Sequence, residues 1–156
     1  MDITALNPPP SPGEVFSYFE RLPLPELTTQ HQPPGNGLSG LPVIFYTDEP
    51  TTETFTVDIR GFQVVINAGA TAFTWNTGDP AEPTITTTDP GAPYPDETIT
   101  HEYASGTYTT SLTVTWGATF TVDGSAPADV PGTTTTTGPE ETFQVLQARP
   151  VLVSPN

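Results

Sequence analysis

An alternation of apolar and polar positions begins near residue 41 and is the clearest pattern in the sequence. It is longest over 107–122, where even positions are mostly apolar and odd positions are mostly threonine. Successive side chains of a β-strand point to opposite faces, so this run predicts a long strand with one buried and one solvated face. Gly117 interrupts the run and predicts a local bend or bulge.

Shorter alternating runs surround this strand. They are rich in β-branched and aromatic residues, are separated by Pro, Gly, Asn or Asp, and lie at 42–47, 54–59, 62–68 and 71–76. After a turn signal at Asp123-Gly124, the pattern predicts an edge strand at 132–138 and further strands at 141–148 and 150–153. No helix is predicted after residue 40. Residues 41–156 are therefore expected to form an all-β sandwich with a long β-hairpin extension.

Residues 1–40 have a different composition. They hold eight of the 20 prolines of the chain, which favour extended backbone and cannot donate to a β-ladder. One helix is expected near 12–22, because Ser11, Pro12 and Glu14 have the spacing of a capping box and Pro23 stops the pattern. We therefore interpret this segment as an extended Pro-rich N-terminal arm that carries a short helix.

The expected helix is amphipathic. Its apolar face and the aromatic residues beside it predict a partner-binding patch made of Val15, Phe16, Tyr18, Phe19 and Leu22. The same face would also suit packing on the chain's own sandwich, and the sequence leaves that alternative open.

Charge narrows the range of partners. The chain of 156 residues has 18 Asp and Glu against three Lys and Arg, for a formal net charge of −15, and it has no Cys. Nucleic acid is excluded as a partner because phosphate binding needs cations. No segment approaches the ~20 apolar residues of a membrane helix, so membrane insertion is not expected. The N-terminal stretch 1–15 lacks the basic and apolar regions of a secretory signal, so either the protein is not exported by that route or the numbering begins after a removed signal. Met1 followed by Asp2 favours a genuine translation start.

The two most informative stretches are "TWNTGDP" at 74–80 and "HEYASGTYTTSLTV" at 101–114. An aromatic residue on an alternating strand is the usual centre of a sandwich core, and a Tyr ahead of a strand can tie a corner to the backbone. We therefore assign these residues to the structural core: Trp75, Tyr103, Tyr108, Leu112, Val114 and Trp116.

An enzyme would use the same stretches differently. His101 would act as a general base, oriented by Asp79 or Glu102. It would need a nucleophile, and the candidate serines lie in turns or on a solvated strand face, outside any G-x-S-x-G elbow: Ser39, Ser105, Ser111 and Ser125. The sequence therefore predicts no catalytic residue and no enzyme.

Metal binding is a second alternative for this region. Asp79, Asp89 and Asp96 follow Trp75, and Ca²⁺ prefers such oxygen ligands. The spacing is not that of an EF-hand, and prolines stiffen the loop. We predict a solvated loop at 79–96 with no metal and no cofactor, and Ca²⁺ binding stays open as the alternative.

These stretches resemble the PKD (polycystic kidney disease) domain family, whose immunoglobulin-like sandwich carries a "WDFGDG"-like turn and then "H-x-Y-x-x-x-G-x-Y-x-V-x-L". The matching residues are Trp75, Gly78 and Asp79, then His101, Tyr103, Gly106, Tyr108 and Leu112. The first motif departs from the family at Asn76, Thr77 and Pro80. The surrounding "LPVIFYTD" and "TTTDPGAPYP" look like PKD-type domains encoded in actinobacteria and their phages, and the resemblance covers roughly residues 20–155.

The expected function is that of a non-enzymatic structural and binding module. The resemblance and the signal-free start predict a decoration or accessory protein on the surface of an actinobacterial phage virion, docked on capsid or tail proteins through the arm. The alternative is a secreted or cell-wall-associated PKD-like protein of an actinobacterium that binds protein or glycan.

Overall fold

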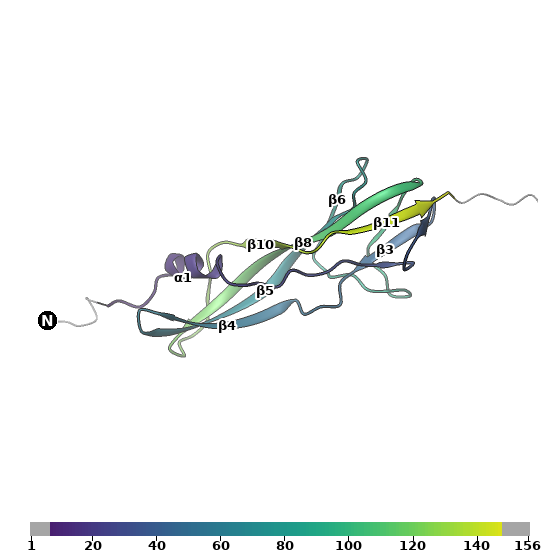
Figure 1. Cartoon of the computed structure of the whole chain (residues 1–156). Coiled ribbons are helices and arrows are strands. Elements are labelled where there is room, and N and C mark those ends of the chain that lie inside the picture. Colours follow the sequence, from purple (N-terminus) through teal and green to yellow (C-terminus); the bar gives the residue numbers. More distant parts are fainter. Residues whose placement is uncertain (1–6, 148–156) are drawn as a thin grey trace, which may run out of the picture.

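Two long antiparallel strands run through the molecule and form the centre of its larger sheet. They are β5 (Phe62–Asn76) and β8 (Gly106–Val122), and Figure 1 shows them along the axis of an elongated shape. The computed structural model describes residues 7–147. Over this range the chain is an all-β, immunoglobulin-like sandwich with one short helix near the N-terminus, as the alternating pattern predicted.

The larger sheet is built around these two strands in the order β2-β11-β8-β5-β4. Three short strands extend it, because β9 and β10 pair with β8 and β6 pairs with β5. The bounds are β2 (Gly37–Leu38), β4 (Thr52–Ile59), β6 (Thr84–Thr87), β9 (Ala128–Asp129), β10 (Thr134–Thr137) and β11 (Glu141–Leu146). The edge strand expected within 132–138 is therefore present as β10.

A smaller sheet completes the sandwich in the order β1-β3-β7, with β1 at Gln30–Gln32, β3 at Pro42–Tyr46 and β7 at Thr100–Glu102. Its inner face contributes Phe45, whose ring lies 6.2 Å from the Trp75 ring and 6.4 Å from the Tyr103 ring. These aromatic contacts are the centre of the core between the two sheets.

The bulge lies on a different strand from the one predicted. The runs at 62–68 and 71–76 join into the single strand β5, and the register with β8 shifts between Ala70 and Ala72. The extra residue is thus Thr71, whereas Gly117 stays in register opposite Gly69. A bulge bends the strand that carries the additional residue, which here is β5.

The helix α1 (Pro12–Phe19) begins where the capping pattern predicted. Ser11 is its N-cap, and the Ser11 hydroxyl accepts from the Glu14 backbone N–H over 3.2 Å. The helix ends at Phe19 rather than near residue 22, because the chain tightens there into hydrogen bonds three residues apart. The Glu14 carboxylate does not return to Ser11 and binds the Arg60 guanidinium instead, at 2.8 Å.

Residues 20–40 differ most from the expected arm. They supply β1, which pairs with β3, and β2, which pairs in parallel with β11. Prolines exclude ladder hydrogen bonds only where they stand, and β1 and β2 fall between them. This segment is therefore part of the sandwich. The strand predicted at 150–153 lies outside the described residues.

Candidate functional site

The arm residues predicted to bind a partner lie against the chain's own domain. Val15 and Phe19 are fully buried in the core cluster. Phe16, Tyr18 and Leu22 are partly buried and pack against the same cluster. The helix face therefore covers the sheet of this chain, and the interpretation of Val15 and Phe19 as partner contacts is wrong for this fold. A helix face with this pattern satisfies its apolar side chains equally well on its own sheet.

The residues assigned to the core lie where the alternation placed them. Trp75, Tyr103, Leu112, Val114 and Trp116 are all buried, and Tyr108 is half-buried against them. The Trp75 indole N–H donates to the Thr87 hydroxyl over 3.1 Å. A buried Trp with its N–H satisfied in this way is a packing residue and not an open ligand platform.

Tyr103 ties the two sheets together near their end. Its hydroxyl donates to the backbone carbonyl of Thr77 over 2.6 Å, and burial raises the pKa of this phenol above its ordinary value. The Tyr108 hydroxyl donates in the same way to the Ala104 carbonyl over 2.8 Å. Both hydroxyls therefore fix backbone and are not positioned to exchange protons with a substrate.

His101 lies between two carboxylates. Its Nε2 is 2.9 Å from Asp79 Oδ2, and its Nδ1 is 3.5 Å from Glu82 Oε2. The predicted orienting role falls to Asp79, whereas Glu102 is exposed because adjacent strand residues face opposite ways. The sequence did not indicate Glu82 as a neighbour of His101, because the turn after β5 is what brings the two side chains together. The His101 ring also packs edge-on against Tyr103, with ring centroids 4.5 Å apart.

This cluster lacks the arrangement that nucleophilic catalysis requires. Both ring nitrogens of His101 face carboxylates rather than a hydroxyl group. Ser111 accepts from Asn76, and Ser125 accepts from the Val122 backbone. The hydrogen bonds from Ala81 N–H and from His101 hold the pKa of Asp79 below its usual value. The cluster therefore joins the turn at 77–83 to β7.

Two of the carboxylates considered as an alternative calcium site have other partners. Asp79 is engaged by His101, and Asp89 accepts from the Thr98 hydroxyl. Within residues 7–147 no three His, Cys, Asp or Glu side chains form a group able to hold a metal ion.

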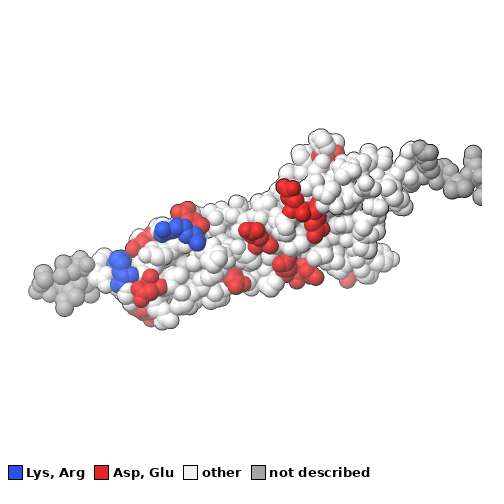
Figure 2. Space-filling model, in the orientation of Figure 1, with Lys and Arg blue, Asp and Glu red and all other residues white. Residues whose placement is uncertain are grey.

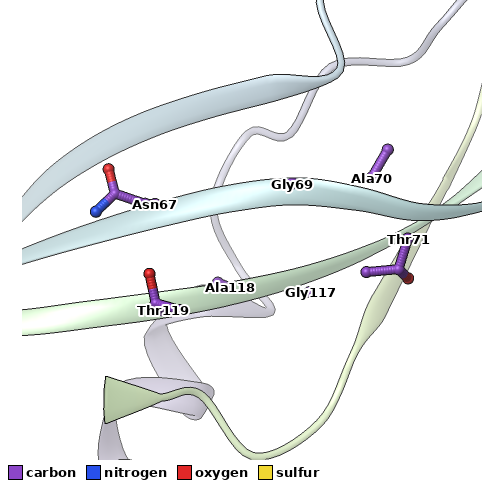
Figure 3. Close-up of a pocket in the computed structure, with 7 residues that line it drawn as sticks. All are labelled: Asn67, Gly69, Ala70, Thr71, Gly117, Ala118 and Thr119. Atoms are coloured by element: carbon purple, nitrogen blue, oxygen red, sulfur yellow. The ribbon is translucent and has the colours of Figure 1, made fainter. Parts of the chain in front are cut away.

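A shallow hollow lies on the outer face of the β5–β8 pair (Figure 3). Its volume is about 280 Å³, and it is lined by Asn67, Gly69, Ala70, Thr71, Gly117, Ala118 and Thr119. This volume is at the lower limit for small-molecule pockets, and the floor is open to solvent. The hollow suits one ring or one side chain better than an enclosed substrate.

Two glycines opposite each other form the floor. Gly69 and Gly117 are register partners, as are Asn67 and Thr119 beside them. A Cβ on Gly69 would meet no atom within 4 Å, and a Cβ on Gly117 would meet only the Thr71 methyl group at 3.2 Å. Neither has the positive φ that would require glycine. The fold therefore does not require glycine at position 69. Glycine in a strand also lowers its stability, so its presence there has no structural advantage.

Two threonines, Thr71 and Thr119, line the hollow, and many more lie elsewhere on the same face of the sheet. The outward positions of the sheet include Thr54, Thr56, Thr74, Thr113, Thr115, Thr119 and Thr121. Several hydroxyls are already oriented: Thr54 donates to the Asn67 amide oxygen over 3.0 Å, and Thr113 lies 2.9 Å from Thr137. The face is thus polar, and several of its hydroxyls have fixed partners.

Charge is distributed unevenly along the molecule. Figure 2 shows Lys and Arg only near the helical end of the visible face, with Asp and Glu spread along it. Arg60 pairs with Glu14 and also donates to Asn7 and Pro8, and Arg21 lies 5.4 Å from the Tyr18 ring. Arg60 therefore fastens the arm to the β4–β5 turn, whereas Arg21 contacts Ser17 and Tyr18 within the arm itself.

Comparison with known proteins finds no matching family model, no matching curated protein and no matching solved structure. Among residues 7–147, no helix has the length and apolar character needed to cross a membrane.

Proposed function

We propose that this chain is a non-enzymatic structural and binding module that assembles with other proteins on the surface of a larger particle. The best candidate is a decoration or accessory protein of an actinobacterial phage virion. The motifs around Trp75 and Tyr103 support this assignment through their resemblance to PKD-type domains. The contacting surface would be the outer face of the β5–β8 pair and not the arm.

The observation that carries the proposal is the hollow over Gly69 and Gly117. Its floor is bare although the fold accepts a side chain at Gly69, and a glycine in a strand often marks close approach by another molecule. The lining threonines, Thr71 and Thr119, offer hydroxyl donors and acceptors, and the Thr71 hydroxyl is held by the Thr115 carbonyl over 3.2 Å. Such a face supports shape-specific contact with a partner and lacks the groups for covalent chemistry.

The test is Gly69→Thr, which fills the hollow with the residue type that the face already uses. Full-length parent and variant are mixed with purified particles of the native source that lack this chain, and co-sedimentation is measured. We expect the variant to stay folded and to lose particle binding. Thr121→Ala is the matched control, because it changes the same face outside the hollow and should bind like the parent. Equal binding by all three proteins would refute the role of the hollow.

A second candidate is a secreted or cell-wall-associated module that binds glycan. The size of the hollow favours it, since about 280 Å³ with an amide and hydroxyls at the rim suits one sugar ring. Titration with cell-wall oligosaccharides separates the two candidates. Binding that Gly69→Thr abolishes would favour the glycan, whereas binding to particles alone favours the virion protein.

A further inference from the structure

The strand β4 has a free edge. It pairs with β5 through eight consecutive residue pairs, from Thr52↔Gly69 to Ile59↔Phe62. On its other side, no strand of the described part of the chain pairs with it. Seen in Figure 1, β4 lies at the margin of the elongated sheet. Eight residues are more than the ordinary length of a strand, so this edge is unusually long for an exposed one.

The direction of its backbone groups follows from the hairpin. Arg60 and Gly61 both have positive φ, at 54° and 91°, which is the two-residue turn that makes Ile59 and Phe62 a hydrogen-bonded pair. Hydrogen-bonded pairs recur at every second residue. The residues whose N–H and C=O point away from β5 are therefore Thr52, Thr54, Thr56 and Asp58. Their side chains are exposed on the outer face.

Most proteins protect such an edge. The usual devices are proline, charged side chains and above all lysine, a bulge or a very short strand, because an open ladder pairs with other chains. The only charges on β4 are Glu53 and Asp58, which repel acidic segments but not basic ones. The sequence of β4, "TETFTVDI", has no proline and no lysine, and its register with β5 is continuous. On the opposite face, Phe55 and Val57 are only partly buried, so each keeps apolar surface beside the edge.

We propose that β4 is a docking edge that takes up an extended, basic segment of a partner protein as an added antiparallel strand. In this mode the backbone ladder provides affinity and alternate side chains provide specificity. The incoming segment would place apolar residues beside Phe55 and Val57, and polar residues beside Thr54 and Thr56. This edge is separate from the hollow, and it adds an interaction that the proposed function does not include.

The acidic residues of β4 indicate which kind of segment would bind at its edge. Glu53 stands on the inner face near the start of β4, and Asp58 stands on the outer face near its end. Lys or Arg opposite these two carboxylates would be favourable, whereas like charges across a strand pair are destabilising. A second copy would place the same acidic strand on this edge and bring together two chains of formal charge −15. The chemistry therefore favours a different, basic chain.

The test uses a defined probe on the full chain. The probe is the blocked peptide Lys-Val-Thr-Val-Thr-Lys. Paired antiparallel to β4, its first Lys would lie opposite Asp58 and its last Lys opposite Glu53. A second peptide, the control, carries Glu in place of both Lys residues. Amide resonances of isotope-labelled protein are followed during each titration. We expect shifts centred on Thr52–Ile59 with the Lys peptide, and about tenfold weaker binding of the Glu peptide. Absence of shifts in β4 would overturn the proposal.

Two variants locate the contact. Thr56→Pro removes one outward N–H and should weaken the Lys peptide about tenfold, whereas Thr56→Ser keeps that N–H and should bind like the parent. Glu53→Lys reverses one charge without touching the ladder and should shift preference toward the Glu peptide. If Thr56→Pro does not fold, the peptide preference of Glu53→Lys alone tests the proposal. Unchanged binding by Glu53→Lys, or self-association through β4 in sedimentation at rising concentration, would refute a basic partner.

Discussion

Trp116 on β8 donates its indole N–H to the hydroxyl of Thr136 on β10 over 2.9 Å. That hydroxyl in turn donates to the backbone carbonyl of Pro25 over 2.8 Å. One threonine side chain thereby links the buried centre of the long sheet to a residue of the N-terminal segment. A Cβ on the nearby Gly138 would overlap the Leu27 carbonyl, so the segment runs directly against the end of β10.

This linkage gives the first prediction. Thr136→Val keeps the shape of the side chain but leaves the Trp116 N–H and the Pro25 carbonyl without their partner. Unsatisfied buried groups of this kind cost about 1–3 kcal/mol each. We expect a fall of that order in the free energy of unfolding, measured by urea denaturation. Thr135→Val, at the exposed neighbouring position, is the control, and equal stability of the two variants would contradict the prediction.

The second prediction concerns the N-terminal segment as a structural element. Phe19 is fully buried, so Phe19→Ala should destabilise the fold by about 3–5 kcal/mol. A chain that starts at Leu41 would also lose β1, β2 and the buried Val15, Leu24 and Leu27, and we expect it not to fold cooperatively. Thermal melts of both proteins test this, with Glu20→Ala as the exposed control. A stable sandwich from Leu41 onward would show that the segment is dispensable.

The third prediction contrasts two glycines. Gly69→Thr should raise the free energy of unfolding by about 0.5–1 kcal/mol, since glycine weakens a strand and a Cβ there is unobstructed. Gly78→Ala should destabilise, because Gly78 has a φ of 78° and its Cβ would lie 2.5 Å from the Thr109 carbonyl oxygen. Chemical denaturation of both variants provides the measurement. A loss of stability in Gly69→Thr would mean that the fold itself requires the bare floor.

The fourth prediction follows from the lowered pKa of Asp79, caused first by the Ala81 N–H and then by His101. A carboxyl whose folded pKa lies below its unfolded value stabilises the fold above the unfolded pKa, and this contribution disappears as the pH falls through the folded value. Thermal midpoints should therefore fall in the acid range below about pH 4. In Asp79→Asn this part of the fall should be missing, whereas Asp96→Asn should behave like the parent. Identical acid profiles for all three proteins would show that Asp79 contributes nothing.

The fifth prediction concerns calcium. Asp79 and Asp89 are already engaged by His101 and Thr98, so the loop does not offer a ready set of oxygen ligands. Melts in EDTA and in Ca²⁺ should superimpose. A ligand that binds only the native state must raise the midpoint, and a Ca²⁺-dependent rise of several degrees would therefore reveal a site.

The sequence predicted the features that depend on local period. Alternation over residues 107–122 identified β8 and its buried face, because side-chain direction along a strand is set by neighbouring residues alone. The capping residues Ser11 and Pro12 located the start of α1 for the same reason. The prediction that the apolar face of α1 binds a partner was wrong, because an amphipathic helix has the same sequence pattern whether it covers its own sheet or a partner.

The hollow and the Glu82 contact were not predictable in this way. The hollow exists because Gly69 meets Gly117 in one register, and a shift of one residue on either strand would place each opposite a different side chain. Glu82 reaches His101 through the turn after β5, whose course depends on hydrogen bonds from Thr77. Both features are set by tertiary pairing between segments that are far apart in the sequence.

The parallel pairing of β2 with β11 joins residues 37–38 to residues 145–146. Loop closure over such a separation must be completed before the contact contributes any stability, so the order of folding is constrained. During synthesis the hairpin of β4 and β5 can form early, whereas β2 must wait until β11 has left the ribosome. Until then the part of β8 at 106–110 lacks its partner strand. The nascent chain therefore exposes an open strand beside a largely finished sheet, and this is the interval in which misassembly competes with folding.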